Sequence, residues 1–135
     1  MKIFLDTSGL LSVFDRADSH KSFWTDSLLR EWKPVTSDYV LDELTTLIAY
    51  KIGADIAHEV LTKLLTLGDS RTLDIIWVNA SYFQKAKDIL KKHNDHSFSF
   101  TDCTSFAICS DLNISSSFAI DADFKRYGLD VFPKP

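Results

Sequence analysis

Four acidic residues stand beside apolar or helical segments and together suggest metal-dependent chemistry. They are Asp6, Glu43, Asp102 and Asp121. Taken singly, each has an ordinary role as a helix cap, a first-turn acid, a solvent-exposed side chain or a turn residue. If the fold brings them together, two carboxylates about 4 Å apart repel by about 4 kcal/mol at an effective dielectric of about 20, so the cluster needs a cation or raised pKa values. Mg²⁺ and Mn²⁺ prefer oxygen ligands, and one or two such ions assist hydrolysis of a phosphodiester.

Short apolar runs alternate with helical patterns along the chain, which indicates how these acids are positioned. The apolar runs predict strands at 2–5, 35–37, 73–78, 117–120 and 130–132. Helical spacing predicts helices at 7–14, 20–32, 38–50, 54–67, 81–92 and 102–109. This alternation predicts a three-layer α/β fold, with a central parallel sheet of about five short strands flanked by helices. Ligands bind such sheets at the carboxyl ends of the strands.

Local signals set several of these bounds. Pro34 is expected to follow a helix that ends at Trp32, and Asp38 is expected to cap the next helix. Gly68 is expected to follow the end of the fourth helix, and Asp102 to open a helix buried on several sides. Asp6 and Asp121 are then the residues that end two strands.

Length and composition limit the class of protein. The chain has 135 residues, which fits one domain over 1–135. Apolar residues make up 45% and charged residues 25%, a balance that excludes intrinsic disorder and simple coiled coils. The net charge of −4 argues against binding of nucleic acid by bulk electrostatics, so any such contact must be local.

Cysteine spacing and apolar run lengths indicate the compartment. Cys103 and Cys109 form no CxxC pair, so we expect two buried thiols rather than a disulfide or zinc site. No apolar run approaches the roughly 18 residues of a membrane span, and Asp6 interrupts the segment where a signal peptide would be apolar. We expect a cytoplasmic protein without membrane contact.

Four sequence strings carry a resemblance to a known family. They are FLDTSGLLSVFDRADSHKSFW, YVLDEL, FSFTDCTSFAIC and FAIDADFKRYG. In this order and at these separations they resemble the four acidic motifs of the PIN-domain ribonucleases, and most closely the VapC-type toxins of toxin–antitoxin pairs. The resemblance covers essentially the whole chain, and the order of all four motifs makes it specific. Cys103 stands where many members carry alanine, a small departure.

The resemblance implies a function and a set of site residues. It implies a PIN-like fold and metal-dependent cleavage of RNA phosphodiester bonds, with Mg²⁺ or Mn²⁺ as one or two ions. Carried over position by position, it makes Asp6, Glu43, Asp102 and Asp121 the catalytic and metal-binding tetrad. Asp123 matches a further acidic position that many members share.

The resemblance also implies partners. It implies an RNA substrate, a cognate antitoxin protein that wraps the helices near Glu43, and a homodimer. The apolar segment Asp38–Leu67 reads as a helical hairpin and is a candidate docking surface for an amphipathic partner. The same surface could instead be the seam of the dimer.

Hydroxyl and basic side chains near the four motifs are secondary candidates. Thr7, Ser8 and Ser105 could contact phosphate or water, or could serve as caps or bond a carbonyl one turn back. The lysines of 85–92 and the pair Lys125-Arg126 are either solvated surface or hold RNA phosphates beside the acidic site.

Three alternatives to a toxin nuclease stay open. One is a housekeeping RNA-processing nuclease, and another is a metal-binding regulatory module of the same shape without turnover. A phosphatase or receiver-like domain would also use Asp and Mg²⁺, but the phosphatase pattern needs a second Asp two residues after Asp6, where Ser8 stands.

Overall fold

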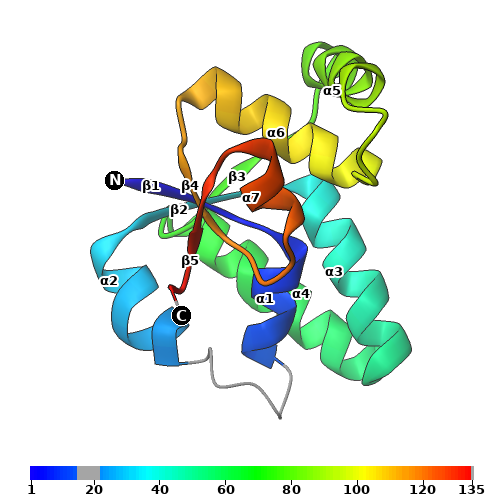
Figure 1. Ribbon diagram of the computed structural model, residues 1–135. Coiled ribbons are helices and arrows are strands. Elements are labelled where there is room, and N and C mark those ends of the chain that lie inside the picture. The colour runs from blue at the N-terminus through cyan, green and yellow to red at the C-terminus, as the bar shows by residue number, and fades with distance from the viewer. Residues whose placement is uncertain (15–21, 135) are drawn as a thin grey trace.

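The fold is built on a five-stranded parallel sheet. The computed structural model describes residues 1–14 and 22–134 (Figure 1). The strands are β1 (Lys2–Leu5), β2 (Lys33–Ser37), β3 (Asp74–Ile76), β4 (Ser116–Phe118) and β5 (Asp130–Phe132). The helices are α1 (Thr7–Phe14), the π-helix η1 (Phe23–Leu28), α2 (Leu29–Glu31), α3 (Asp38–Lys51), α4 (Ala54–Asp69), α5 (Ala80–Lys92), α6 (Phe100–Leu112) and α7 (Asp123–Tyr127).

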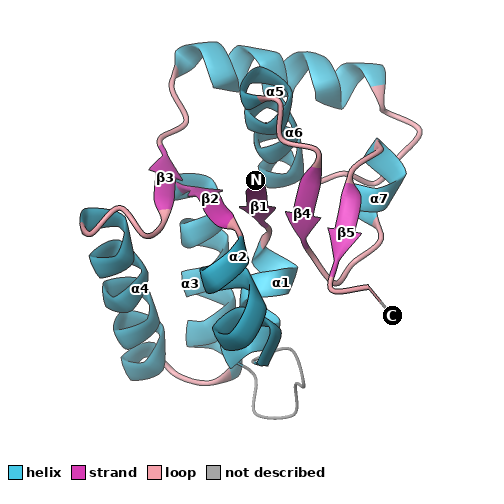
Figure 2. Ribbon diagram, turned by 90° about the vertical axis from the view of Figure 1, so that its left-hand side faces the viewer, coloured by secondary structure: helices cyan, strands magenta, loops and turns pink. Residues whose placement is uncertain are grey.

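The strand order places β1 at the centre of the sheet. The order is β3-β2-β1-β4-β5, and every neighbouring pair is parallel. Helices α1 to α4 lie on one side of the sheet, and α5 and α6 lie on the other (Figure 2). The predicted three-layer α/β fold with about five parallel strands is therefore confirmed. The chain reverses its direction of sheet growth between β1 and β4, and ligands of α/β proteins bind at such a switch point.

The core forms around β1, β4 and α6. Phe4, Phe106, Phe118 and Phe124 are fully buried, and the ring of Phe106 meets that of Phe124 at 4.9 Å between centroids. Helix α6 is buried along most of its length, as its apolar sequence predicted. Both cysteines are free and buried, as expected, and burial raises the pKa of the Cys109 thiol to about 12.

Two differences from the predicted bounds bear on the site. The side chain of Ser37, and not that of Asp38, caps α3 by accepting the N–H of Val40 at 3.2 Å. The carboxylate of Asp38 instead accepts the N–H of Val78 at 2.8 Å, a contact between residues 40 apart that a local pattern does not reveal. The strand predicted at 117–120 ends at Phe118, so Asp121 lies in the loop beyond β4, and the short helix α7 was not predicted.

Other bounds also differ. Trp32 lies outside α2, and Pro34 lies inside β2 rather than before it, in register with Ile3 of β1. Gly68 lies inside α4, which continues to Asp69. The absence of a side chain on Gly68 leaves room there for Ile75 of β3. The predicted start of a helix at His20 lies outside the described residues. Within the described residues, no helix is long and apolar enough to cross a membrane.

Candidate active site

Three carboxylates lie at the same carboxyl edge of the sheet, within range of one another's charge. Asp6 follows β1, Asp121 lies in the loop after β4, and Asp102 lies in the first turn of α6. The charges of Asp121 and Asp102 both raise the pKa of Asp6, and the charge of Asp121 also raises the pKa of Asp102. The fold thus brings together three of the four predicted acids from distant parts of the chain, at the topological switch point.

Asp6 is the most buried acid of the three. Its side chain is 1% exposed, and its backbone N–H donates to the carbonyl of Phe118 at 3.0 Å, which holds it against the end of β4. Desolvation by burial raises the pKa of Asp6 to about 7, although hydrogen bonds from Ser8 act in the opposite direction. The carboxyl group therefore carries an incomplete charge at neutral pH unless a cation accompanies it.

Asp102 has both a structural and an electrostatic role. Its carboxylate accepts the N–H of Ser99 at 3.1 Å, and Ser99 accepts the N–H of Asp102 at 3.0 Å, which is a reciprocal capping box at the start of α6. The spacing S-x-x-D was present in the sequence as a signal for this cap, and α6 begins at Phe100 rather than at Asp102. Burial, followed by the charges of Asp121 and Asp123, raises the pKa of Asp102 to about 6.

Asp121 and Asp123 form the outer part of the cluster. The backbone N–H of Asp123 donates to Asp121 at 3.2 Å, so the loop after β4 folds back on itself. Partial desolvation and the charge of Asp123 raise the pKa of Asp121, whereas the positive charge of Arg126 lowers it. The ion pair between Arg126 and Asp123 was not predicted, because it depends on α7.

Glu43 is the one predicted tetrad residue without a contact to the others. It lies on α3, which packs against both α1 and α6, and its side chain is half-buried. Its carboxylate makes no hydrogen bond or ion pair with the residues that the structure describes. Its part in the site stays a prediction.

The three hydroxyl candidates differ in their partners. Ser8 donates to Asp6 at 2.6 Å and accepts the N–H of Ile120 at 2.9 Å. Ser105 donates to the carbonyl of Thr101 at 3.1 Å, which is the local bond that its sequence position allowed. Thr7 Oγ1 is buried, beside Asp6 in the chain, and has no hydrogen-bond partner among the described residues. A buried hydroxyl without a partner is costly, so it marks a place for a polar ligand or water.

The donor chemistry of the site fits a hard divalent cation. Carboxylate oxygens of raised pKa and an unpartnered hydroxyl are groups that Mg²⁺ or Mn²⁺ stabilises by direct or water-mediated contact. Across residues 1–14 and 22–134, however, no three acidic, histidine or cysteine side chains stand close enough together to hold an ion as they are placed. The described acids therefore share an electrostatic environment without forming a complete set of metal ligands as placed.

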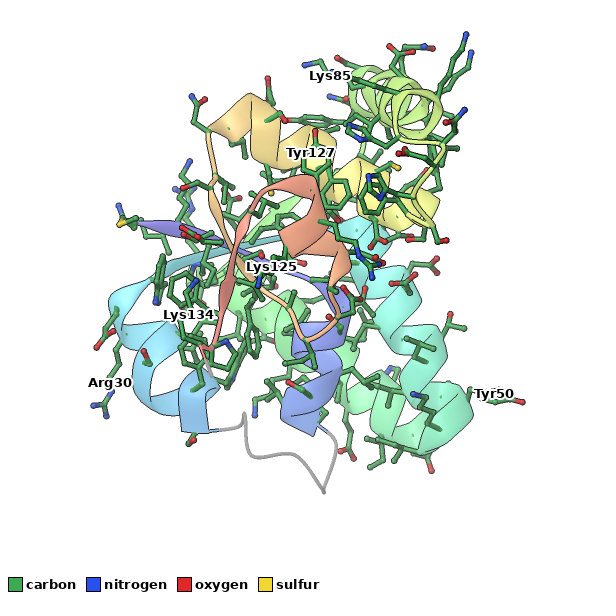
Figure 3. The ribbon with its side chains drawn as sticks, in the orientation of Figure 1. Arg30, Tyr50, Lys85, Lys125, Tyr127 and Lys134 are labelled. Atoms are coloured by element: carbon green, nitrogen blue, oxygen red, sulfur yellow. The ribbon has the colours of Figure 1, made fainter. Side chains whose placement is uncertain are left out.

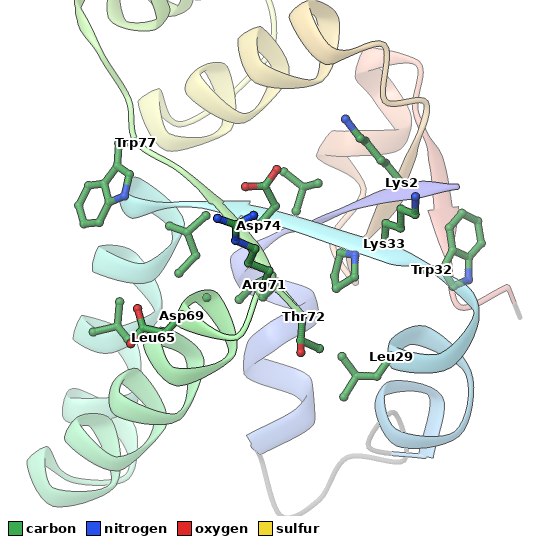
Figure 4. A pocket seen from close by; sticks show the side chains of 15 residues that line it. Lys2, Leu29, Trp32, Lys33, Leu65, Asp69, Arg71, Thr72, Asp74 and Trp77 are labelled. Atoms are coloured by element: carbon green, nitrogen blue, oxygen red, sulfur yellow. The ribbon is translucent and has the colours of Figure 1, made fainter.

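A separate cavity lies away from the acidic residues. A groove of about 880 Å³ runs between α2 and α4 over the amino ends of the strands (Figure 4). Leu29 and Trp32 line one side, Leu65 and Asp69 line the other, and Lys33 lies between them. This groove is lined by none of the proposed site acids, so it is a second surface and not the acidic site; those acids are Asp6, Glu43, Asp102, Asp121 and Asp123.

Comparisons of sequence and of structure with known proteins identify the same family. The family model described as PIN domain matches residues 3–129. The 23S rRNA-specific endonuclease VapC20 of Mycobacterium tuberculosis is 30% identical over 98% of this chain and 99% of its own length. The crystal structure of M. tuberculosis VapC20, called a sarcin–ricin loop cleaving toxin, superposes with a TM-score of 0.83 at 26% identity, covering 95% of this chain and 96% of that one.

A more distant structure shares the fold. VapBC2 from Rickettsia felis, solved with a DNA fragment from its promoter, matches with a TM-score of 0.69 at 17% identity, over 97% of both chains. At this identity the likeness concerns the arrangement of the helices and strands alone.

Proposed function

The chain belongs to the PIN domain family and is an endonuclease of its VapC type, and we propose that it cuts RNA at the acidic edge of its sheet with Mg²⁺ or Mn²⁺. The proposed metal-binding and catalytic residues are Asp6, Glu43, Asp102 and Asp121, with Asp123 as an additional ligand. We further propose that the protein acts inside the cell as the toxin of a toxin–antitoxin pair.

One observation carries this proposal. Asp6, Asp102 and Asp121 come from three separate segments, and the pKa of each is raised by burial and by a neighbouring carboxylate. A purely structural role gives no reason to gather like charges that destabilise the fold. A site that holds divalent cations gives such a reason, and it supports the proposal for these residues.

Each residue has a proposed task in hydrolysis. A bound Mg²⁺ or Mn²⁺ supplies a water of lowered pKa and neutralises charge on the phosphate. The carboxylates of Asp6 and Asp102 would hold the ion, and their burial would limit competition from bulk water. Ser8 fixes the orientation of Asp6 and the loop that carries Asp121. Thr7 Oγ1 is proposed to contact the phosphate or a water.

Cleavage of total cellular RNA is the test of this proposal. The purified protein is incubated with Mn²⁺ or Mg²⁺, and new 5′ ends are mapped by sequencing beside Asp102→Asn and Glu43→Gln. We expect discrete cuts that require the metal and are lost in both variants. Asp69→Asn, which removes an exposed acid from the opposite side of the molecule, serves as the charge-matched control. Equal background from all proteins would contradict a nuclease function at this site.

An antitoxin is the proposed partner, and the hairpin α3–α4 is its proposed docking surface. Several apolar side chains on this hairpin are exposed, with Tyr50 at 91% as the extreme. Leu65 of α4 also lines the groove, on the side opposite Leu29 and Trp32. Co-expression with the gene adjacent to this reading frame is expected to yield a stable complex and to restore growth. Leu65→Asp is expected to weaken that complex while RNA cleavage is unchanged.

We also propose a homodimer. The hairpin α3–α4 could form its interface instead of binding the antitoxin. Sedimentation of the free protein and of Leu65→Asp decides between the two uses. A variant that still dimerises but loses the antitoxin assigns the surface around Leu65 to the antitoxin.

A further inference from the structure

Arg126 is a basic residue that contacts an acid at the edge of the acidic site. Its Nη1 lies 3.2 Å from Oδ1 of Asp123, and the backbone N–H of Asp123 donates to Asp121 at 3.2 Å. The guanidinium therefore lies at the rim of the acidic cluster, connected to it through direct contacts.

Helix α7 holds the backbone of Arg126 firmly while its side chain stays in solvent. Phe124 on the same helix is fully buried, and its ring stacks with that of Phe4 at 6.2 Å between centroids. Gly128, in the left-handed conformation at φ 114°, ends the helix. The side chain of Arg126 is 59% exposed. The backbone of Arg126 is therefore fixed relative to β1, whereas its guanidinium can turn toward a new partner.

The existing ion pair is easily exchanged. An exposed pair at this i,i+3 spacing contributes little to stability and is weakened by salt. A guanidinium forms two parallel hydrogen bonds with a phosphate, which is a stronger and better oriented contact. Asp123 is itself a proposed metal ligand. A divalent cation bound at its carboxylate would weaken the attraction between that carboxylate and the guanidinium of Arg126.

Because RNA is negatively charged, the acidic site needs a positively charged side chain nearby to bind it. The protein carries a net charge of −4, and the described acids at this edge repel a polyanion. RNA binding then requires cations placed locally beside the reacting phosphate. Among the described residues, Arg126 is a basic residue that direct contacts place there.

We propose that Arg126 binds a phosphate oxygen of the RNA strand at the acidic site, exchanging Asp123 for the phosphate when the RNA enters. This inference rests on the proposed nuclease function and deepens it by naming the substrate-binding residue. Asp123 keeps the guanidinium at the rim until then.

Lys125 offers a matched control on the same helix. It is the adjacent residue, carries the same charge, and is exposed (Figure 3). It makes no hydrogen bond or ion pair with the part of the chain that the structure describes. A general effect of positive charge on α7 would appear in both variants, whereas a phosphate contact specific to Arg126 would appear in one.

The test measures RNA affinity as a function of salt. The probe is a fluorescein-labelled RNA oligonucleotide that spans a cleavage site mapped with the wild-type protein. Binding is followed by anisotropy in an Asp102→Asn background, which prevents cleavage, for Arg126→Ala, Arg126→Lys and Lys125→Ala. Cleavage rates of the same three substitutions in the otherwise wild-type chain, and Mn²⁺ affinity by calorimetry, are measured alongside.

We expect Arg126→Ala to weaken RNA binding about tenfold or more and to reduce the slope of log K against log salt by about one. Arg126→Lys is expected to keep that slope and lose part of the affinity, and Lys125→Ala to stay within twofold of its parent. Mn²⁺ affinity is expected to be no weaker in any of the three variants than in their parent.

Three results would overturn the inference. An unchanged salt slope in Arg126→Ala together with weaker Mn²⁺ binding would make Arg126 a positioning residue for Asp123. Equal losses in Arg126→Ala and Lys125→Ala would indicate a diffuse field around α7. Failure of the wild-type protein to cleave any RNA would contradict both the nuclease function and this inference. That outcome differs from the other two because in them the wild-type protein is active.

Discussion

The hydroxyl of Ser8 donates a hydrogen bond of 2.6 Å to Oδ2 of Asp6. The hydroxyl oxygen of Ser8 also accepts the backbone N–H of Ile120 at 2.9 Å and that of Asp121 at 3.4 Å. One side chain thus connects the acid at the end of β1 to the loop that follows β4. This connection keeps two proposed metal ligands in a fixed relation.

Ser8→Ala is expected to reduce activity more than stability. The change removes a donor to the Asp6 carboxylate and an acceptor for two backbone N–H groups. Loss of a hydrogen bond to a charged group costs about 1.5–3 kcal/mol, which corresponds to a loss of roughly tenfold to hundredfold in cleavage rate. Single-turnover cleavage and thermal unfolding measure the two effects. Ser12→Ala is the control, because Ser12 donates to the carbonyl of Gly9 within the same helix and does not touch the acids. Equal rates in both variants would contradict the role of Ser8.

The metal-free protein is expected to lose stability as the pH rises from about 4 to about 7. The pKa of Asp6 is about 7 in the folded state against 3.8 in the unfolded chain, so the folded state holds a proton that the unfolded state has released. The contribution is fully present below the unfolded pKa and disappears as pH passes the folded pKa, with an upper bound of about 4 kcal/mol. Denaturant unfolding in EDTA at several pH values measures it. Asp6→Asn is expected to flatten the profile, and a parallel profile in that variant would refute this assignment.

Divalent metal is expected to stabilise the protein more at pH 7.5 than at pH 5.5. The pKa values of Asp6 and Asp102 are raised to about 7 and about 6, so a lower pH protonates the carboxylates that would bind the ion. At a hundredfold excess over its dissociation constant, a ligand adds about 2.7 kcal/mol. The shift in melting temperature with Mn²⁺ measures this effect. It is expected to vanish in Asp102→Asn and to persist in Asp69→Asn; persistence in both would place the metal elsewhere.

Gly9→Ala is expected to disrupt both the fold and the site. A Cβ at this position would lie 2.3 Å from the backbone oxygen of Phe118, so α1 would have to move away from β4. We expect a loss of about 3 kcal/mol or more and of nearly all cleavage. At Gly68 the corresponding Cβ would lie 2.6 Å from Cδ1 of Ile75, which is the end of a flexible side chain.

Gly68→Ala is therefore the matched control for Gly9→Ala. It is expected to be close to neutral, since the gain in helix propensity, about 1 kcal/mol, offsets a small repacking. Chemical denaturation and cleavage assays on the pair test the prediction. Similar losses at both positions would show that the backbone contact at Gly9 is not the decisive one.

The fold class and the neighbourhood of the site follow from the amino-acid sequence alone. Strands and helices have distinct local periodicities, and parallel strands must end at the same edge, so Asp6 and Asp121 were expected to meet there. The order of the four acidic motifs pointed to the family without any knowledge of contacts.

How the acids are held, and which charges act on them, depends on the packing of distant segments. Ser8 and Ile120 are 112 residues apart, and Asp38 and Val78 are 40 apart, so no local signal pairs them. The burial that raises the pKa of Asp6 depends on packing from several elements, and the contact of Arg126 with Asp123 depends on a helix too short to have a clear periodicity. Local patterns identify elements because the chain's own geometry sets them, whereas solvation and long-range contacts exist only after the elements have packed.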